Sequence, residues 1–517
     1  MKRKKNFIPE YGGGIPVGYN EKKDEYLYER LDYHSGVDGA TGIGKTTRIF
    51  IPAVYIMGQH KENMIISDNK REIYSTTKKY LEKQGYDVRI VDYRNPEYGD
   101  RVNLLQEVIN HVDEGDLDSA QMEAIDLAAS LIPRSENETP MWGDGSESAI
   151  ASVILAICLR KDFPITTKSI SNVFNNIIQL GKSEQDGSIL DRYFNSPKRT
   201  QIEKIAFGNY GMSSSKVRMS FNTMATSSIR EYSYEKVKKQ TSYSDFNLRD
   251  YTKTDSKPFA LFIVSPDEKD SMNRMAPGLV EYCYRVLVDE SNRCDKSKLP
   301  TRWHFLLDEF TNNGKFKNFV QRLTLSRGRN IFYHLGYQGT PQIQSLYGEK
   351  DTQSILDNLG IRIWTEFADQ TEIKDFQEKT GHLAVVSSTQ TENSRGLFDI
   401  SLNKNSYQYN SSRVPIFKNE YLTTLGIPDA VAKRRSMYAF KTILPVWMDT
   451  GLVNVFEKTN NNEIYPRIED DITEYWKLLP DPMANLYKPQ PDIDLEPIDF
   501  YDNESENNVD LPDNENY

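Results

Sequence analysis

GATGIGKT at residues 39–46 is the stretch that decides the fold, because it fits the G-x-x-x-x-G-K-[ST] pattern of a phosphate-binding P-loop. Its glycines let backbone N–H groups wrap around phosphates, while the lysine reaches the β and γ phosphates and the hydroxyl binds Mg²⁺. The motif therefore predicts a nucleoside triphosphate with Mg²⁺ as the ligand. The residues expected to bind it are Gly39, Thr41, Gly42, Gly44, Lys45, Thr46 and Thr47.

The sequence around the motif alternates between strand-like and helix-like segments. Short apolar runs typical of buried strands occur at 34–37, 63–67, 87–92, 259–264, 303–307 and 331–337. The segment after the P-loop has helical periodicity, and Pro52 within it predicts a kink or a break. This order predicts an α/β fold with a parallel central sheet.

Helical periodicity replaces this alternation between about residues 104 and 240. We interpret that stretch as an all-α domain inserted into the α/β domain. The predicted division is an N-terminal segment at 1–33, a nucleotide-binding domain at 34–103 and 241–460, the all-α domain at 104–240 and a C-terminal extension at 461–517. Residues 383–415, rich in Ser, Thr, Asn and Gln, suit irregular β structure or a loop.

A second half of the nucleotide site is indicated by the apolar run at 305–307, which ends in two acids, Asp308 and Glu309. One carboxylate at a strand end can hold the Mg²⁺ that Thr46 also binds, and its neighbour can orient or deprotonate the attacking water. We predict Asp308 as the metal ligand and Glu309 as the catalytic base. The adjacent acids favour a motor that hydrolyses ATP.

Two further residues are candidates for catalysis. Gln338 follows the next predicted strand, where its amide could sense the γ-phosphate, although a surface position suits it nearly as well. Arg327 and Arg329 follow the same acids in sequence and are expected near the site. In ring ATPases an arginine from the neighbouring subunit stabilises the transition state, so we assign this role to Arg327 or Arg329, with Arg327 as the first candidate and a surface ion pair as the alternative.

Composition limits the remaining classes of protein. The chain has 517 residues and a net charge of −11, of which residues 489–517 carry −10, with ten Asp or Glu and no Lys or Arg. The body is therefore nearly neutral and can carry basic patches, for which the candidates are 216–218, 236–239 and 433–435. Taken singly, each of them is better explained as a solvated face than as a nucleic-acid contact. The acidic tail is expected to be disordered and to recruit a partner, or only to aid solubility.

No apolar run reaches the roughly 18 to 20 residues of a membrane-spanning helix, and the basic residues 2–5 are not followed by an apolar signal segment. We expect a cytoplasmic protein. The three cysteines lack the spacing of a disulfide framework or a zinc site.

Taken in order, these motifs resemble the type IV coupling proteins of conjugative DNA transfer, of the TraG/TraD type. The resemblance covers about residues 34–440. It rests on the P-loop followed by Ile51-Pro52, on DNKRE at 68–72, Trp142, TSYSDF at 241–246, LLDEF at 306–310, Gly314-Lys315, Ser326-Arg327-Gly328, Gln338 with Gln342 and Gln344, Tyr347-Gly348 and Thr380-Gly381.

The resemblance implies a RecA-like ATPase domain interrupted by an all-α domain, assembled as a homo-hexamer. Such a ring couples ATP hydrolysis to the movement of single-stranded DNA with its relaxase toward a type IV secretion channel. Two features depart from the family. The chain has no transmembrane helices, so a separate membrane-anchoring protein would hold it at the inner face of the membrane. Arg71 replaces a family glycine in the 68–72 loop, which puts the role of that loop in doubt.

Two other functions fit the same motifs. One is an FtsK/HerA-like motor for DNA packaging or segregation. The other is a nucleotide-regulated scaffold that receives substrates and has little motor activity.

Overall fold

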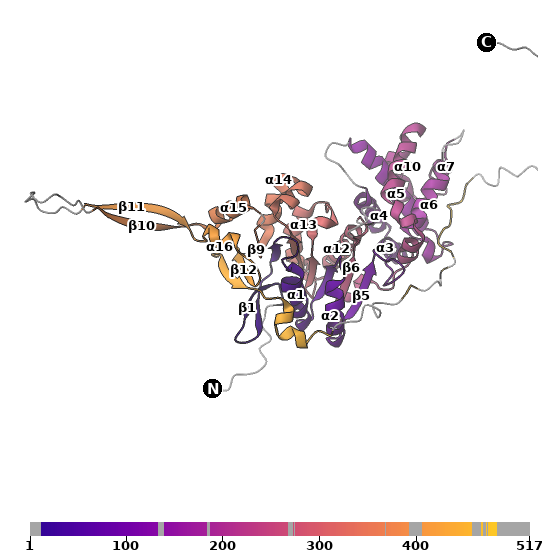
Figure 1. The fold of residues 1–517 in the computed structure, drawn as a ribbon. Coiled ribbons are helices and arrows are strands. Elements are labelled where there is room, and N and C mark those ends of the chain that lie inside the picture. Colours follow the sequence, from indigo (N-terminus) through magenta and orange to yellow (C-terminus); the bar gives the residue numbers. More distant parts are fainter. Residues whose placement is uncertain are drawn as a thin grey trace, which may run out of the picture.

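The computed structural model describes residues 12–132, 139–182, 187–266, 272, 274–367, 369–391, 406–457, 467–468, 472 and 474–482. These residues form a large central sheet with a helical domain on one side and a long hairpin arm on the other (Figure 1). The α/β architecture with a mainly parallel sheet confirms the predicted fold class.

Nine strands make the central sheet, in the order β13-β12-β9-β3-β8-β7-β4-β6-β5. All pairings from β9 to β5 are parallel, and β12 and β13 add antiparallel pairs at one edge. The parallel strands are β3 (His34–Asp38), β4 (Asn63–Ser67), β5 (Asp87–Asp92), β6 (Phe259–Val264), β7 (Trp303–Leu307), β8 (Ile331–Tyr337) and β9 (Leu359–Trp364). The antiparallel strands are β12 (Asp429–Arg434) and β13 (Phe440–Ile443).

Helices cover both faces of this sheet. On β4, Met64 and Ile66 belong to a core shared with α1 (Ile51–Gln59) and α2 (Glu72–Lys83), whereas Ile65 belongs to the opposite core. That second core includes α12 (Met275–Arg293), α13 (Phe319–Ser326) and α14 (Thr340–Asn358). Burial on both faces explains why the strands read as continuous apolar runs.

The helix does not break at Pro52, where a kink or a break was expected, because the backbone at Phe50 and Ile51 stays right-handed helical and only the helix type changes. Pro52 lies in the first turn of α1, directly after the π-helical turn η1 (Thr46–Phe50). A proline inside a helix removes one backbone hydrogen bond, and here the adjustment is the wider π-helical turn that precedes it.

The helical domain is joined to the edge of the sheet. The chain leaves along the edge strand β5 and returns as β6, between β4 and β5. Its central helix α5 is buried almost continuously from Ser146 to Cys158, and Gly145 lies so close to the Phe221 ring that a Cβ would be 2.3 Å from it. The helices are α3 (Gln106–Glu114), α4 (Leu117–Leu131), α5 (Pro140–Cys158), α6 (Ile170–Leu180), α7 (Ile189–Asn195), α8 (Gln201–Ala206), α9 (Gly208–Gly211), α10 (Ser215–Ser228) and α11 (Glu235–Thr241).

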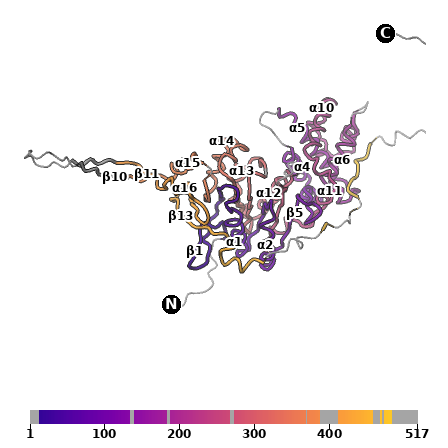
Figure 2. Tube along the Cα trace, viewed as in Figure 1, coloured from indigo at the N-terminus to yellow at the C-terminus, as the bar shows by residue number. Residues whose placement is uncertain are grey.

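Residues 383–415, for which irregular β structure or a loop was expected, contain two regular strands. β10 (His382–Thr391) and β11 (Ser406–Pro415) pair over ten residues each and extend away from the body (Figure 2). A small core around Trp364, Phe376 and Phe417 holds the base of the arm against α15 (Gln370–Thr380) and α16 (Asn419–Thr423). A second hairpin, β1 (Pro16–Asn20) with β2 (Glu25–Tyr28), lies next to β13.

Residues 474–482 lie along the helical domain, although they are about 300 positions away from those helices in the sequence. The Trp476 indole donates to Ser171 Oγ at 3.1 Å, and the Leu479 N–H donates to Asn176 Oδ1 at 2.8 Å. Residues 474–482 of the extension are thus bound to the helices. The acidic tail at 489–517 lies outside the described residues.

Candidate nucleotide site

Parallel pairing places the predicted motifs at one edge of the sheet. Asp38, the last residue of β3, pairs with Tyr337 of β8; Leu307 of β7 pairs with Leu335 of β8 and with Ser67 of β4. The loops that follow these strands therefore start side by side. Ligand sites of open α/β sheets occur at this carboxyl edge.

The P-loop has the backbone that a phosphate cradle requires. Gly42 and Gly44 have φ of +85° and +82°, a region that residues with a Cβ rarely adopt. The Lys45 ammonium is buried beneath the loop and donates to the carbonyls of Gly39 at 2.5 Å and Ala40 at 3.1 Å. Burial lowers its pKa, and the nearby carboxylate of Asp308 opposes this effect.

Thr46 and Asp308 meet although 262 residues separate them. The Thr46 hydroxyl donates to Asp308 Oδ2, and Asp308 is almost fully buried. Burial raises the pKa of Asp308 to about 6, against the lowering effect of the Thr46 hydrogen bond. Among the described residues no cluster of three or more His, Cys, Asp or Glu could hold a metal alone. A hydroxyl and one carboxylate suit Mg²⁺, which is usually bound with phosphates and water as its other ligands.

Glu309 adopts a left-handed backbone conformation, with φ +57° and ψ +46°. Its carboxylate accepts hydrogen bonds from the amides of Asn69 at 3.5 Å and Asn312 at 3.0 Å, and lies 3.8 Å from Lys70 Nζ. Strained backbone of this kind clusters at functional sites. Glu309 is thus held in a defined position beside Asp308 by a second loop.

That second loop is DNKRE at 68–72, whose role the substitution at Arg71 had put in doubt. Arg71 adopts φ +59°, so it keeps the left-handed conformation that a glycine would take without strain. Its guanidinium lies 3.6 Å from the buried Asp92 carboxylate, which fixes the side chain away from Glu309. Burial raises the pKa of Asp68, at the start of the loop, to about 7. The loop therefore retains its shape and supplies Asn69 and Lys70 to the site.

Gln338 follows β8 at the same edge. Its Oε1 accepts from Gln342 at 3.3 Å, and Gln342 in turn accepts from the Thr311 hydroxyl at 2.9 Å. The neighbouring Gly339 N–H donates to Asp38 Oδ1 at 2.8 Å, which ties this loop to the strand before the P-loop.

Sequence reasoning missed Asp38. It is fully buried immediately before Gly39, and its other neighbours are Arg362, at 3.8 Å, and Glu372. Burial raises its pKa well above the usual value, and Glu372 adds to the effect. The sequence did contain a signal for Asp38, because an acidic residue is unusual at the end of an apolar strand directly before a P-loop.

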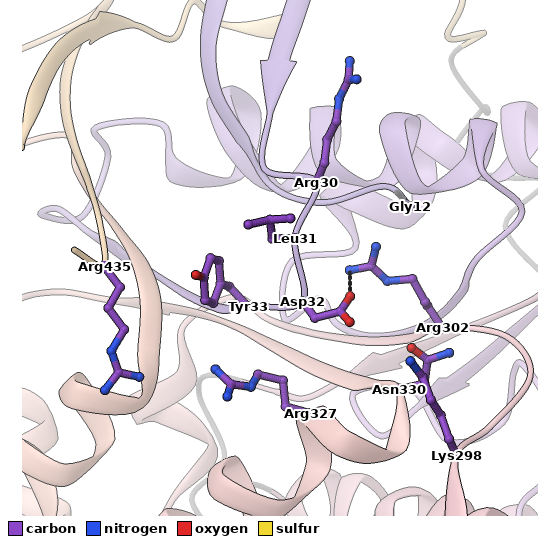
Figure 3. A pocket seen from close by; sticks show the side chains of 10 residues that line it. All are labelled: Gly12, Arg30, Leu31, Asp32, Tyr33, Lys298, Arg302, Arg327, Asn330 and Arg435. Carbon is purple, nitrogen blue, oxygen red and sulfur yellow. Dashed lines mark ion pairs between the residues drawn. The ribbon is translucent and has the colours of Figure 1, made fainter. Parts of the chain in front are cut away.

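The expectation that the 326–329 arginines lie near the P-loop of their own chain is wrong. Arg327 and Arg329 precede β8, so they lie at its amino end, on the opposite edge of the sheet from the loop after β3. Arg329 donates to Ser291 and Asn292 on α12, at 2.9 and 2.7 Å. Arg327 is exposed and lines a cavity at that edge (Figure 3).

A model of the protein family described as type IV secretory system conjugative DNA transfer matches residues 2–433. The chain belongs to this family. Its fold is similar to that of the plasmid coupling protein TrwB. The structure of TrwB with the non-hydrolysable ATP analogue ADPNP matches with a TM-score of 0.58 and 16% identity over 89% of this chain and 93% of TrwB.

TrwB in complex with ADP and Mg²⁺ matches with a TM-score of 0.56 and 17% identity, over 84% of this chain and 88% of the other. At such identities the likeness establishes a shared fold. None of the curated proteins matches the sequence. No helix in the described part of this coupling-family protein is long and apolar enough to cross a bilayer.

Proposed function

We propose that this protein binds ATP with Mg²⁺ and hydrolyses it to move single-stranded DNA toward a type IV secretion channel during conjugation. The observation that carries the proposal is the convergence of the P-loop, Asp308 and Glu309 at one sheet edge, in a chain of the conjugative DNA-transfer family.

The residues present fit the nucleotide. A Cβ on Gly42 would face open space, and Gly44 supplies the positive φ that the loop needs. Lys45 needs only to release two carbonyls to reach a phosphate. Thr46 and Asp308 already share a hydrogen bond and would hold Mg²⁺ between them and the phosphates. When bound, the metal neutralises charge that develops on the phosphates.

Glu309 is suited to orient and deprotonate the attacking water. Asn69 and Asn312 fix its carboxylate, Lys70 Nζ lies 3.8 Å away, and the Glu309 side chain is still 19% exposed, so water can reach it. We propose that Gln338 senses the γ-phosphate, because its loop is coupled to the P-loop strand through Asp38.

Steady-state ATPase assays with and without single-stranded DNA test this function. We expect DNA to stimulate hydrolysis in the wild type. Lys45→Ala should lose nucleotide binding, whereas Glu309→Gln should still bind nucleotide but hydrolyse it roughly 10² to 10⁴-fold more slowly. Glu349→Gln, an equivalent change at an exposed position on α14, is the control. DNA-independent activity that survives Glu309→Gln would favour a nucleotide-regulated scaffold.

We further propose that the protein acts as a homo-hexamer, receives DNA with its relaxase, and works at the inner face of the membrane through a separate anchoring protein. The support is membership of the family. Arg327 cannot reach the P-loop of its own chain and would act in trans in such a ring.

Mixing of inactive subunits tests the trans role of Arg327. Lys45→Ala subunits have an intact Arg327, and Arg327→Ala subunits have an intact P-loop. If Arg327 acts across the interface, a mixture of the two should recover part of the ATPase activity that each lacks alone. An Arg327→Ala protein that hydrolyses ATP at the wild-type rate contradicts the assignment.

A further inference from the structure

The edge of the sheet opposite the nucleotide site carries a basic cavity of about 780 Å³. Five cations and one acid line it, together with Gly12, Leu31, Tyr33 and Asn330: the cations are Arg30, Lys298, Arg302, Arg327 and Arg435, and the acid is Asp32 (Figure 3). They come from segments distant in sequence, which precede β3, β7 and β8 or follow the antiparallel β12. Parallel topology brings these segments to one edge, as it does for the nucleotide loops.

Most of this positive charge is not neutralised by the described part of the protein. Arg302 pairs with Asp32 at 3.5 Å and with the buried Glu62 at 3.7 Å. Arg30, Lys298, Arg327 and Arg435 are exposed and have no ion-pair partner among the described residues. Because the whole chain is acidic, four such cations around one hollow mark a local site for anions.

Exposed apolar side chains lie directly beside this charge. A second hollow shares Arg30 and Leu31 with the first and is also lined by Met437 of the β12–β13 turn and by Phe440, the first residue of β13. Met437 is 56% exposed and Tyr438 is 85% exposed, at the tip of that turn. Arg434 at the base of the turn is held by Glu29 at 3.4 Å and lies over the Tyr33 ring.

We propose that this edge docks on an anionic lipid surface, with Arg30, Lys298 and Arg435 binding headgroup phosphates and Met437 and Tyr438 entering the interface. Large apolar side chains beside cations suit the boundary between headgroups and acyl chains, where Tyr also collects. A phosphate backbone of nucleic acid would match the cations but would leave Met437 and Tyr438 at the tip of the turn in water.

Vesicle flotation with the full-length protein tests the proposal. The wild type should float with vesicles of equimolar phosphatidylglycerol and phosphatidylcholine, remain unbound with phosphatidylcholine alone, and be released by high salt. Arg30→Gln with Arg435→Gln should weaken partitioning roughly tenfold or more. Met437→Ser with Tyr438→Ser should also weaken it, while the dependence on salt persists.

Lys216→Gln with Arg230→Gln removes the same charge from exposed positions of the helical domain and should leave flotation unchanged. All variants leave Arg327 intact, so a role of that residue in hydrolysis does not affect the result. Single-stranded oligonucleotide binding is measured on the same proteins and should not change with Arg30→Gln and Arg435→Gln. The proposal is overturned if the wild type does not float, if the cavity variants float like the control, or if they lose DNA affinity and keep lipid binding.

Discussion

Individual residues at the nucleotide site combine burial with charge. Asp308 is the clearest case, since burial raises its pKa to about 6 while Thr46 hydrogen-bonds to its oxygen. A carboxylate must be deprotonated to bind a metal, so proton and Mg²⁺ compete for this side chain. Its burial thus makes metal binding sensitive to pH in a range where an exposed aspartate would be fully ionised.

We therefore expect Mg²⁺-dependent nucleotide affinity to be constant above about pH 7 and to fall below pH 6, by roughly tenfold per unit at the acid limit. Fluorescent ADP titrations with Mg²⁺ or with a chelator measure this. Nucleotide phosphates also take up protons near this pH, so Asp308→Asn, which removes the carboxylate, provides the reference. An identical pH profile in Asp308→Asn would show that Asp308 is not the metal ligand.

At the scale of the helices and strands, one arginine joins α3 of the helical domain to α12, which packs on the sheet. Arg249, in the turn η4 (Leu248–Tyr251), lies 2.6 Å from Glu107 and 2.5 Å from Glu114 of α3, and 3.7 Å from Glu290 of α12. Glu107 is 1% exposed, so it depends on this partner. Burial raises the pKa of Glu107 to about 7 despite the guanidinium, which shows that desolvation exceeds the attraction between the pair.

Arg249→Met should consequently destabilise the protein by about 3 to 5 kcal/mol, because it leaves a buried carboxylate without its cation. The loss should be smaller below pH 7, where Glu107 takes up a proton. Thermal unfolding at pH 6 and pH 8 measures both effects. Arg293→Met removes an arginine that is 45% exposed and pairs with Glu114 and Glu290, and it should change stability little. Equal effects of the two substitutions would contradict this account.

At the scale of the whole molecule, the nucleotide site and the basic cavity lie at opposite edges of one sheet. The carboxyl edge carries the P-loop, Asp308 and Glu309, and the amino edge carries the basic cavity. The helical domain and the hairpin arm lie at the two lateral ends (Figure 1). The chain outside the described residues includes the acidic tail, which changes the net charge from about −1 for residues 1–488 to −11.

Deletion of residues 489–517 should leave ATPase activity unchanged and reduce binding of a basic partner such as the relaxase, because ten uncompensated acids suit a positive surface and repel DNA. Calorimetric titration with the relaxase and the frequency of conjugative transfer are the measurements. A scrambled tail of equal charge should restore both, whereas a tail with Asn and Gln in place of the acids should not. If relaxase binding is unchanged after the deletion, the tail does not recruit this partner and serves only to keep the protein soluble.

The fold class and the nucleotide motifs could be predicted from local sequence. A P-loop needs glycines at particular positions of the backbone, and strands buried on both faces must be apolar throughout. Both features can therefore be recognised within a few consecutive residues. The hairpin arm was not predicted as regular strands, because Ser, Thr, Asn and Gln dominate its sequence and such a composition is also typical of loops.

By itself the sequence determined six parallel strands of the central sheet, the P-loop and the pair Asp308-Glu309. Only the tertiary structure decided which side chains meet: Thr46 with Asp308, Glu309 with Asn69, Asp38 with Gly339, and the cations of the opposite edge. It also removed Arg327 from the site of its own chain. The reason is physical, since these encounters depend on the order and direction of strands in the sheet, and periodicity within one strand carries no information about its neighbours.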